Sequence, residues 1–411
     1  MVQTLEELYK EREQRVIDAV QLKVPDRVPI SIPFSFFPAK YGGITVQDAY
    51  YDIKKWRKAF FKTVLDFAPD RCGLSVNQSG LVLETLDSKQ MKWPGHGVSP
   101  NHTHQFVEGE YMTADEYDLF LDDTSDFLIR RYLPRVYGAL APFANLPPLN
   151  AMFGMIPFNN LATPEFATLF ETLLKAARYW LEWQDEISSM TEELNALGFP
   201  ARGGGGGAGA PFDMISDFLR GMRGTMLDML RQPDKLLEAI EMLSRRQINR
   251  IAEIPEAEEF NLSFIALHRG ADGFMSNKQF EIFYWPTLKK SIEALVDKGY
   301  TPNIFFEGEY TSRLEYLLEL PKGKVIGLFD RSDMARVKEV LGNHICIAGN
   351  VPPSLLQAGT VQEVKDYCKW LIDVVGKDGG YIMAPGCSVD EVEPENLKAM
   401  VDFTKEYGVY S

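Results

Sequence analysis

The organisation of this chain is clearest in the run Gly380-Tyr381-Ile382-Met383-Ala384-Pro385-Gly386-Cys387. A short apolar segment ends abruptly in Pro-Gly, a lone thiol follows, and helical sequence continues from Val389 to Tyr407. A cysteine just past the carboxyl end of a strand lies where α/β barrels keep their catalytic residues. A buried, unreactive cysteine is the alternative, but other reactive side chains at equivalent places upstream favour a functional role.

Similar short apolar runs, each ending in a polar or small residue, alternate with helical sequence upstream of this one, at 260–268, 302–307, 324–330 and 344–350. This βα order implies parallel strands joined by crossover helices. Runs at 28–34, 70–76 and 201–210 bring the total to eight. Eight parallel strands with no obvious edge predict a closed (β/α)8 barrel of the TIM type rather than an open doubly wound sheet.

The rest of the chain adds elements around this barrel. Residues 1–24 have the periodicity of an amphipathic N-terminal helix, and helices are also expected at 46–67 and 164–196. Between about 81 and 148 the βα pattern breaks, and alternating apolar residues suggest an inserted segment that carries a hairpin. We expect residues 1–411 to form a single barrel domain with this insertion.

Two segments allow ligand-binding interpretations that their spacing does not favour. His96, His102 and His104 lie close in sequence but have no regular metal-ligand spacing and no acidic or thiol companion. A surface loop or the rim of a pocket is the alternative that we favour for them. The glycine run 203–209 lacks the Lys and Ser/Thr of a phosphate-binding loop, so we interpret it as a strand that leaves space in the barrel.

Composition excludes several classes of protein. Among 411 residues, 45% are hydrophobic and 25% charged, and the formal net charge is −15. No basic stripe offsets this charge, which argues against nucleic-acid binding, and no apolar run approaches the about 18 residues of a membrane span. Four scattered cysteines, no CxxC pair and a charged N-terminus without a signal-peptide core indicate a cytoplasmic enzyme.

Polar residues at the ends of the predicted strands should face one mouth of the barrel. They are His268, Arg269, Glu307, Glu309, Asp330, Asn350 and Cys387. Imidazole, carboxylate and thiolate are the ligands of zinc, and a catalytic zinc takes three protein ligands and keeps one open position. His268, Glu307 and Cys387 satisfy that count, although hydrogen bonding to each other or to substrate without a metal is the alternative.

Asp330 follows the apolar run 325–329, so its carboxylate should lie beside an apolar wall. Such a setting raises the pKa of a carboxylate and suits it to general acid or base catalysis. The alternative role for Asp330 is the N-cap of a helix that begins near Ser332.

Four segments resemble the uroporphyrinogen decarboxylase superfamily. They are Ile347-Ala348-Gly349-Asn350-Val351-Pro352-Pro353, Gly379 to Cys387, Glu393-Pro394-Glu395-Asn396-Leu397 and, more loosely, Pro25-Asp26-Arg27-Val28-Pro29. The closing strand, Gly379 to Cys387, is similar to that of the superfamily's methyltransferase branch. The resemblance implies a single (β/α)8 barrel, and with it we assign Asn350 to cofactor binding.

The resemblance also separates two activities. True uroporphyrinogen decarboxylases carry an arginine-rich motif after the first strand, whereas this chain has the nearly uncharged loop 34–40. A polyanionic porphyrinogen needs several cations, so we expect no porphyrinogen decarboxylase here. The other branch comprises corrinoid-dependent methyltransferases with zinc on a His-x-Cys pair and a later cysteine. Cys387 matches the later cysteine, but Phe305-Phe306-Glu307 replaces the pair, leaving Glu307 as its acidic counterpart.

A carboxylate in place of a thiolate makes zinc a harder Lewis acid, which suits an ether or hydroxyl oxygen better than a thiol. An aromatic-lined mouth would hold a flat apolar substrate, although each such side chain could equally belong to the core. The candidates are Phe34, Phe36, Phe37, Phe212, Phe305 and Tyr310. Our leading hypothesis is a zinc-dependent O-demethylating methyltransferase, with Glu307 and Asp330 as catalytic residues, acting on a methoxylated, aromatic substrate.

No corrinoid-binding DxHxxG loop occurs in the chain, so the cobalamin or other corrinoid should arrive on a separate partner protein. One alternative is a metal-independent decarboxylase or lyase of the same superfamily, acting on a non-porphyrin acid with Asp330 and His268 as acid and base. A non-enzymatic binding protein on this barrel is a second alternative.

Overall fold

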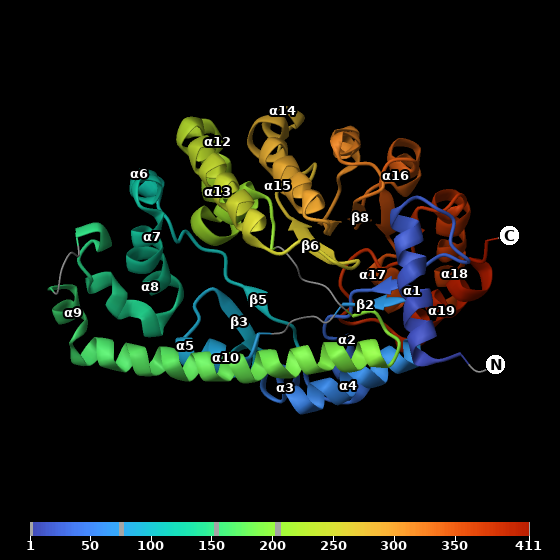
Figure 1. Ribbon diagram of the computed structural model, residues 1–411, viewed down its shortest axis with the longest axis horizontal. Helices are drawn as coiled ribbons and strands as arrows, with labels where there is room; N and C mark the ends of the chain where they lie inside the picture. Colours follow the sequence, from blue (N-terminus) through green and yellow to red (C-terminus); the bar gives the residue numbers. More distant parts are fainter. Residues whose placement is uncertain (1–2, 74–77, 152–155, 202–206, 411) are drawn as a thin grey trace.

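A parallel sheet forms the centre of the molecule (Figure 1). The computed structural model describes residues 3–73, 78–151, 156–201 and 207–410. Five strands pair in the order β10-β9-β8-β7-β6, all parallel. They are β6 (Leu262–Leu267), β7 (Thr301–Phe306), β8 (Ile326–Phe329), β9 (Cys346–Gly349) and β10 (Tyr381–Ile382). All five predicted C-terminal strands are therefore confirmed, in neighbouring positions.

Two short strands extend this sheet beyond β10. β1 (Ser31–Ile32) pairs in parallel with β2 (Arg71–Cys72). A parallel bridge joins Ile30 to Met383, and the Met383 amide donates to the carbonyl of Pro29 at 2.8 Å. The described chain thus has seven parallel strands in the order expected of a barrel, β2-β1-β10-β9-β8-β7-β6.

The predicted eighth strand, 201–210, would stand between β2 and β6. Residues 202–206 lie outside the described residues, and residues 207–210 form no strand. Gln247 holds this segment, because its amide nitrogen donates to the carbonyl of Gly209 at 3.0 Å and its amide oxygen accepts from the Gly209 amide at 3.2 Å. Closure of the barrel therefore remains a prediction.

Amphipathic helices cover the outer face of the sheet. The main ones are α4 (Ile53–Phe67), α13 (Pro233–Glu253), α15 (Trp285–Asp297), α16 (Met334–Leu341), α18 (Val361–Leu371) and α19 (Pro394–Tyr407). α18 illustrates their origin: Thr360 and Glu363 form a capping box, and Val364, Cys368 and Leu371 are buried along one stripe. Shorter elements precede several of them, including α2 (Phe37–Gly42), α3 (Val46–Tyr51), α11 (Pro211–Ile215), α12 (Gly221–Arg231), α14 (Asn277–Gln279) and α17 (Pro353–Ala358).

Alternation along the strands divides the core into two clusters. Side chains such as Ile304, Ile347 and Met383 pack with the outer helices. The intervening residues, including Leu262, Ile326, Ala348 and Ile382, pack instead with the N-terminal helix α1 (Leu5–Val20). The end of α1 at Val20 lies beside Gly323, which precedes β8, and Leu22 just after α1 lies beside Gly380, which precedes β10. Since α1 also contacts β2 and β10, it covers the amino ends of the strands.

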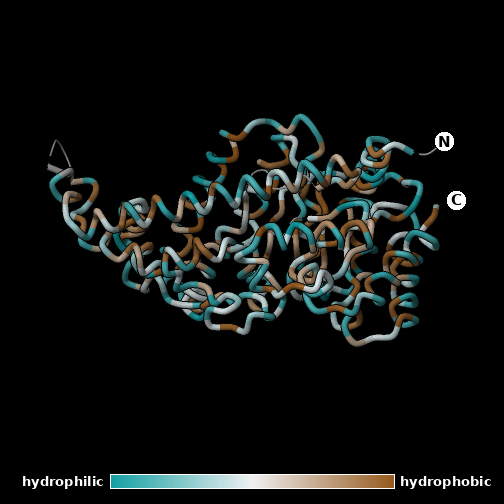
Figure 2. The backbone as a smooth tube through the Cα atoms, turned by 90° about the horizontal axis from the view of Figure 1, so that it is seen from below, coloured by the Kyte–Doolittle hydropathy of each residue, from teal (hydrophilic) through white to brown (hydrophobic). Residues whose placement is uncertain are grey.

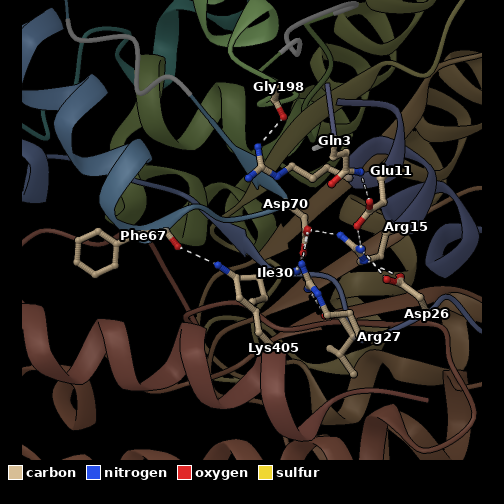
Figure 3. A network of polar contacts seen from close by, with 12 residues as sticks. Gln3, Glu11, Arg15, Asp26, Arg27, Ile30, Phe67, Asp70, Gly198 and Lys405 are labelled. Carbon is tan, nitrogen blue, oxygen red and sulfur yellow. Dashed lines mark hydrogen bonds and ion pairs between the residues drawn. The ribbon is translucent and has the colours of Figure 1, made fainter. Parts of the chain in front are cut away.

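A buried charge network fastens α1 to these amino ends (Figure 3). The Asp70 carboxylate, which is completely buried, accepts hydrogen bonds from Arg15 at 2.6 Å and from both terminal nitrogens of Arg27 at 2.7 and 2.8 Å. It also accepts from the Ile30 amide at 2.8 Å. Arg15 in turn bonds the partly exposed Asp26. The network therefore joins α1, the start of β1 and the start of β2.

An arm extends on the side of the molecule opposite to α18 and α19 (Figure 1). Its sheet has β3 (Met91–Pro94) between β4 (Gly97–Val98) and β5 (Gln105–Phe106), with β3 and β5 antiparallel. Short helices accompany it: α5 (Gly80–Leu86), α6 (Tyr117–Asp122), α7 (Thr124–Phe127), α8 (Leu133–Val136) and α9 (Ile156–Leu161). The 33-residue helix α10 (Pro164–Ala196), which confirms the predicted long helix, runs beneath the arm. Within the described ranges, no helix has the length and apolar character to cross a membrane.

Candidate functional site

Polar residues lie just beyond the carboxyl ends of β6, β7 and β8. They are on the same face of the sheet as the buried cluster that packs with α1. On β6, Phe264 and Ala266 share a face with His268, because side chains two residues apart point the same way. Asn303 and Phe305 on β7 lead in the same way to Glu307, and Ile326 and Leu328 on β8 to Asp330. The structure thus brings three of the predicted residues to one end of three adjacent strands.

His268 and Glu307 are direct neighbours. The His268 Nε2 atom lies 3.5 Å from a Glu307 carboxylate oxygen. On the other side of the ring, Nδ1 lies 2.5 Å from the Asp217 carboxylate. This hydrogen bond to Asp217 raises the pKa of His268 above its usual value, against the opposing effect of burial. Asp217 therefore fixes the ring so that Nε2 faces Glu307.

A second aspartate, Asp213, holds the backbone of the same loop. Its carboxylate accepts from the His268 amide at 2.8 Å, the Arg269 amide at 3.0 Å and the Tyr284 hydroxyl at 2.6 Å. Burial raises the pKa of Asp213 to about 6. Neither aspartate was predicted. Their signal was available: Asp213 and Asp217 are four residues apart in helical sequence that directly follows a predicted strand.

Asp330 lies beside Glu307 and is largely buried. Its carboxylate accepts from the Gly308 amide at 3.1 Å, and burial raises its pKa in spite of that bond. The alternative N-cap role is wrong, because Asp333 caps α16 through the amides of Ala335 and Arg336. The Asp330 environment therefore favours the protonated carboxyl more than water does, which is the direction that general acid catalysis needs.

Cys387 reaches the same mouth from β10. Its thiol is half-buried and donates to the Ser388 carbonyl at 3.5 Å. Burial, together with the negative charges of Asp330, Asp390 and Glu307, raises the pKa of Cys387 to about 11. Burial and these carboxylates therefore favour the protonated thiol over the opposing charge of Arg331, whereas a bound cation would favour the thiolate.

The donors suit zinc in type, and an imidazole held by a carboxylate is a common arrangement around zinc. Among the described residues, however, no group of three or more His, Cys, Asp and Glu is gathered closely enough to hold a metal. His268 and Glu307 are adjacent, whereas among the described residues the Cys387 thiol forms its hydrogen bond with the Ser388 carbonyl and none with His268 or Glu307. His268, Glu307 and Cys387 therefore have the ligand types that zinc takes. Of the three, His268 and Glu307 are also close together.

Asn350 has partners within its own chain. Its amide nitrogen donates to the carbonyls of Asp330 at 3.0 Å and Ser332 at 3.3 Å, and its oxygen accepts from the Tyr367 hydroxyl at 2.9 Å. These bonds fix the loop that carries Asp330. These bonds occupy the Asn350 amide within the chain and give it a structural role, whereas its cofactor-binding role stays a prediction.

Most of the predicted aromatic contacts belong to the core. Phe34, Phe37, Phe212 and Tyr310 are completely buried among apolar neighbours, so their placement as substrate contacts is corrected. Phe34 and Phe37 follow β1 and Tyr310 follows β7, but these rings pack in the core beneath the outer helices. Phe305 is partly exposed on the inner face and stacks at 6.4 Å with Phe264, which is 54% exposed. Phe305 lies two residues before Glu307, and Phe264 lies four residues before His268. We call these two rings the aromatic floor of the site.

Phe36 borders a pocket of about 410 Å³ beside the loop that follows β10. The Phe36 amide donates to Asp390 at 3.0 Å, which ties the loops after β1 and β10 together. The other lining residues are Lys40, Ile44, Val46, Asn101, Thr103 and Glu391. The histidine-bearing loop therefore lies at a pocket rim, as the favoured alternative predicts.

The histidines of that loop are spread out. His104 bonds the Tyr50 hydroxyl at 2.7 Å and packs edge-on against Phe36. His96 stacks instead on Trp93 at 4.6 Å. Within the part of the chain that the structure describes, they share no metal-binding cluster.

Comparison with known families shows to which family the chain belongs. The model of the uroporphyrinogen decarboxylase (URO-D) family matches residues 202–407, half of its length. The chain belongs to the URO-D family. The matched half includes Asp213, Asp217, His268, Glu307 and Cys387, so the whole predicted ligand set lies within the URO-D match.

Two curated URO-D relatives, both named uroporphyrinogen decarboxylase, show how distant the sequence is. The protein of Chlorobium phaeovibrioides is 28% identical over 137 residues, 32% of this chain and 38% of the relative. That of Syntrophotalea carbinolica is 28% identical over 131 residues, 32% of this chain and 37% of the relative. The chain matches little more than a third of the length of these relatives.

The solved structure of a methyltransferase from Methanosarcina mazei has the same fold over nearly the whole chain. Its TM-score is 0.61, with 98% of this chain and 99% of the other covered, at 17% sequence identity. The arm and the N-terminal half therefore belong to an architecture that this solved methyltransferase also has, although the URO-D model itself matches from residue 202 onward.

Proposed function

We propose that this chain is a zinc-dependent methyltransferase that moves a methyl group from a methoxylated aromatic substrate to a corrinoid carried by a partner protein. The observation that carries the proposal is the polar cluster of His268, Glu307 and Asp330 above the rings of Phe264 and Phe305. The full-length structural likeness to a methyltransferase supports this reaction class. The proposal includes closure of the barrel by residues 201–210.

The aromatic floor and the polar cluster would contact different parts of the substrate. Phe264 and Phe305 offer stacked, partly exposed faces to an aromatic ring. An ether oxygen on that ring would then lie toward the strand ends, beside Glu307 and Asp330. The proposed ligands His268, Glu307 and Cys387 would hold a zinc that supplies Lewis acidity to this oxygen.

Proton handling falls to the residues of the chain. The methyl–oxygen bond breaks with its electron pair left on oxygen, and the reduced corrinoid supplies the pair for the new bond to the methyl carbon. The oxygen must gain a proton, and Asp330 can give one because burial raises its pKa. Asp217 keeps His268 oriented throughout, since it holds the Nδ1 side of the ring.

The test uses the purified chain, reduced free cobalamin and a panel of methoxybenzoates. We expect the demethylated phenol and methylcobalamin to appear in equal amounts, measured by chromatography and absorbance. Glu307→Gln should lower the rate about 100-fold or more, by weakening the metal site. The matched control is Glu309→Gln, two residues along on the same loop and also exposed.

Two results would overturn the proposal. Release of CO2 from carboxylated panel members without methylcobalamin would favour the decarboxylase alternative, which uses Asp330 and His268 without metal. Absence of both phenol and methylcobalamin, with zinc-loaded protein, would reject a methyl transfer from methoxylated aromatics.

A further inference from the structure

A second row of apolar side chains runs along the outer face of α10, separate from the row that packs against the arm. The packed row includes Phe166, Leu169, Ala176 and Trp183. The outer row consists of Ala167, Phe170, Leu174, Ala177 and Leu181, all exposed. The exposed fractions of its three large members, Phe170, Leu174 and Leu181, are 44%, 54% and 61%.

The spacing of the outer row is that of a coiled-coil seam. Its members follow one another at intervals of three, four, three and four residues, so that they share one stripe of the helix. From Phe170 to Leu181 the stripe is about 16 Å long at about 1.5 Å per residue. Figure 2, seen from below, looks onto this helix and shows hydrophobic residues recurring along it. A surface stripe of this kind marks an interaction site.

The charges beside the stripe indicate what covers it. Glu171 and Arg178 follow Phe170 and Ala177 directly, on the same edge of the stripe, and both are exposed. Within the described residues, neither forms an ion pair with its own chain. When two copies of α10 pack antiparallel about a two-fold axis, each edge faces the same edge of its partner. A stripe with one acidic and one basic end on that edge complements itself.

The register follows from the sizes of the side chains. If Leu174 of one copy packs opposite Ala177 of the other, Phe170 packs opposite Leu181, and each layer combines one larger with one smaller residue. Glu171 then lies within two residues, or about 3 Å along the axis, of Arg178 on the second copy. The two-fold axis repeats the contact, so one interface contains two such pairs.

We propose that the outer stripe of α10 joins two copies of this chain in an antiparallel pair, with Glu171 of each copy bound to Arg178 of the other. The interface lies on α10, the long helix that runs beneath the arm (Figure 1). The proposal is independent of the reaction that the site performs.

A charge-exchange series measured by analytical ultracentrifugation tests this pairing. The wild-type chain should form a dimer whose fraction rises with concentration. Glu171→Arg and Arg178→Glu should each raise the dissociation constant about tenfold, because each replaces two attractive contacts by two repulsive ones. The double variant, which exchanges both charges, should recover the wild-type value. Since both residues are exposed, folding should be unaffected, which circular dichroism verifies.

Glu182→Arg is the matched control, because Glu182 is exposed on the same helix but lies outside the charged edge. It should leave the dissociation constant unchanged. A chain that stays monomeric to about 100 μM, well above the micromolar range of weak complexes, would overturn the proposal. So would a dimer that the single charge reversals do not weaken, or a double variant that is no better than either single one.

Discussion

Replacing Asp70 by Asn should weaken the fold far more than the same replacement at Asp26, although both carboxylates bind Arg15. Asp70 is completely buried and accepts bonds from Arg15, Arg27 and the Ile30 amide. In the Asn variant, Arg15 keeps Asp26 and Glu11, whereas Arg27 keeps the Val28 carbonyl at 3.0 Å. Arg27, whose side chain is only 15% exposed, then lacks its counter-charge.

The expected loss follows from burial. Removing one partner of a buried ion pair costs about 3–5 kcal/mol, whereas an exposed pair contributes about 0–1 kcal/mol. The side chain of Asp26 is 61% exposed, so Asp26→Asn belongs to the second class. An unfolding entropy of about 2.1 cal/mol/K per residue makes 1 kcal/mol equal to roughly 1 °C for this chain. We therefore expect Tm to fall by roughly 3–6 °C for Asp70→Asn and by about 1 °C or less for Asp26→Asn.

Differential scanning calorimetry of the wild-type chain and both variants measures these shifts under one set of conditions. Urea unfolding provides the corresponding free energies, with the slope checking that the unfolded state is unchanged. Equal shifts for the two variants, or a fall of less than about 1 °C for Asp70→Asn, would show that the Asp70 network does not hold α1 to the strands as we argue.

Three further predictions concern the site. Asp217→Asn should lower the pKa of His268, which NMR titration of the imidazole measures directly; an unchanged pKa would reject the role of Asp217. Because the folded-state pKa of His268 is raised, its protonated form should stabilise the fold fully below about pH 6.5. This stabilisation should be lost as the pH rises through the raised value. Urea unfolding at several pH values should show the loss in the wild type but not in Asp217→Asn. In metal-free protein at pH 8, a Cys387 pKa of about 11 leaves roughly one thiol in a thousand ionised. Its alkylation by iodoacetamide should therefore be slow and should quicken in Asp330→Asn, whereas fast alkylation of wild type would contradict the raised pKa.

Strand order and strand ends were predictable from local sequence, because each βα unit carries its own signal. The run 324–330 has an apolar strand, a polar end and a following helix, and the structure places Asp330 there. The same reasoning placed His268 and Glu307 at strand ends that face one mouth, and in the structure they are 3.5 Å apart on the neighbouring strands β6 and β7. Side chains on a strand point the same way at every second residue. Counting back from His268 in steps of two therefore reaches Phe264, and counting back from Glu307 reaches Phe305.

Side-chain direction beyond the strand ends could not be predicted in this way. Phe34 and Phe37 follow β1 at the mouth, but their rings turn into the helical layer because Phe60 and Phe67 of α4 receive them there. That choice depends on a tertiary partner about 30 residues away, which local pattern does not contain. Asp217 is similar, since only the folded loop brings it to His268, 51 residues later in the chain.

The metal content of the purified chain tests the central proposal most directly. After incubation with zinc and dialysis, elemental analysis should find about one zinc per chain, as three protein ligands and an open position require. His268→Ala, Glu307→Gln and Cys387→Ser should each lose most of it while remaining folded. Cys368→Ala, which removes a buried thiol on the outer helix α18, should retain it. A wild-type chain that stays free of zinc, or a Cys387→Ser variant that keeps a full equivalent, would contradict the zinc site.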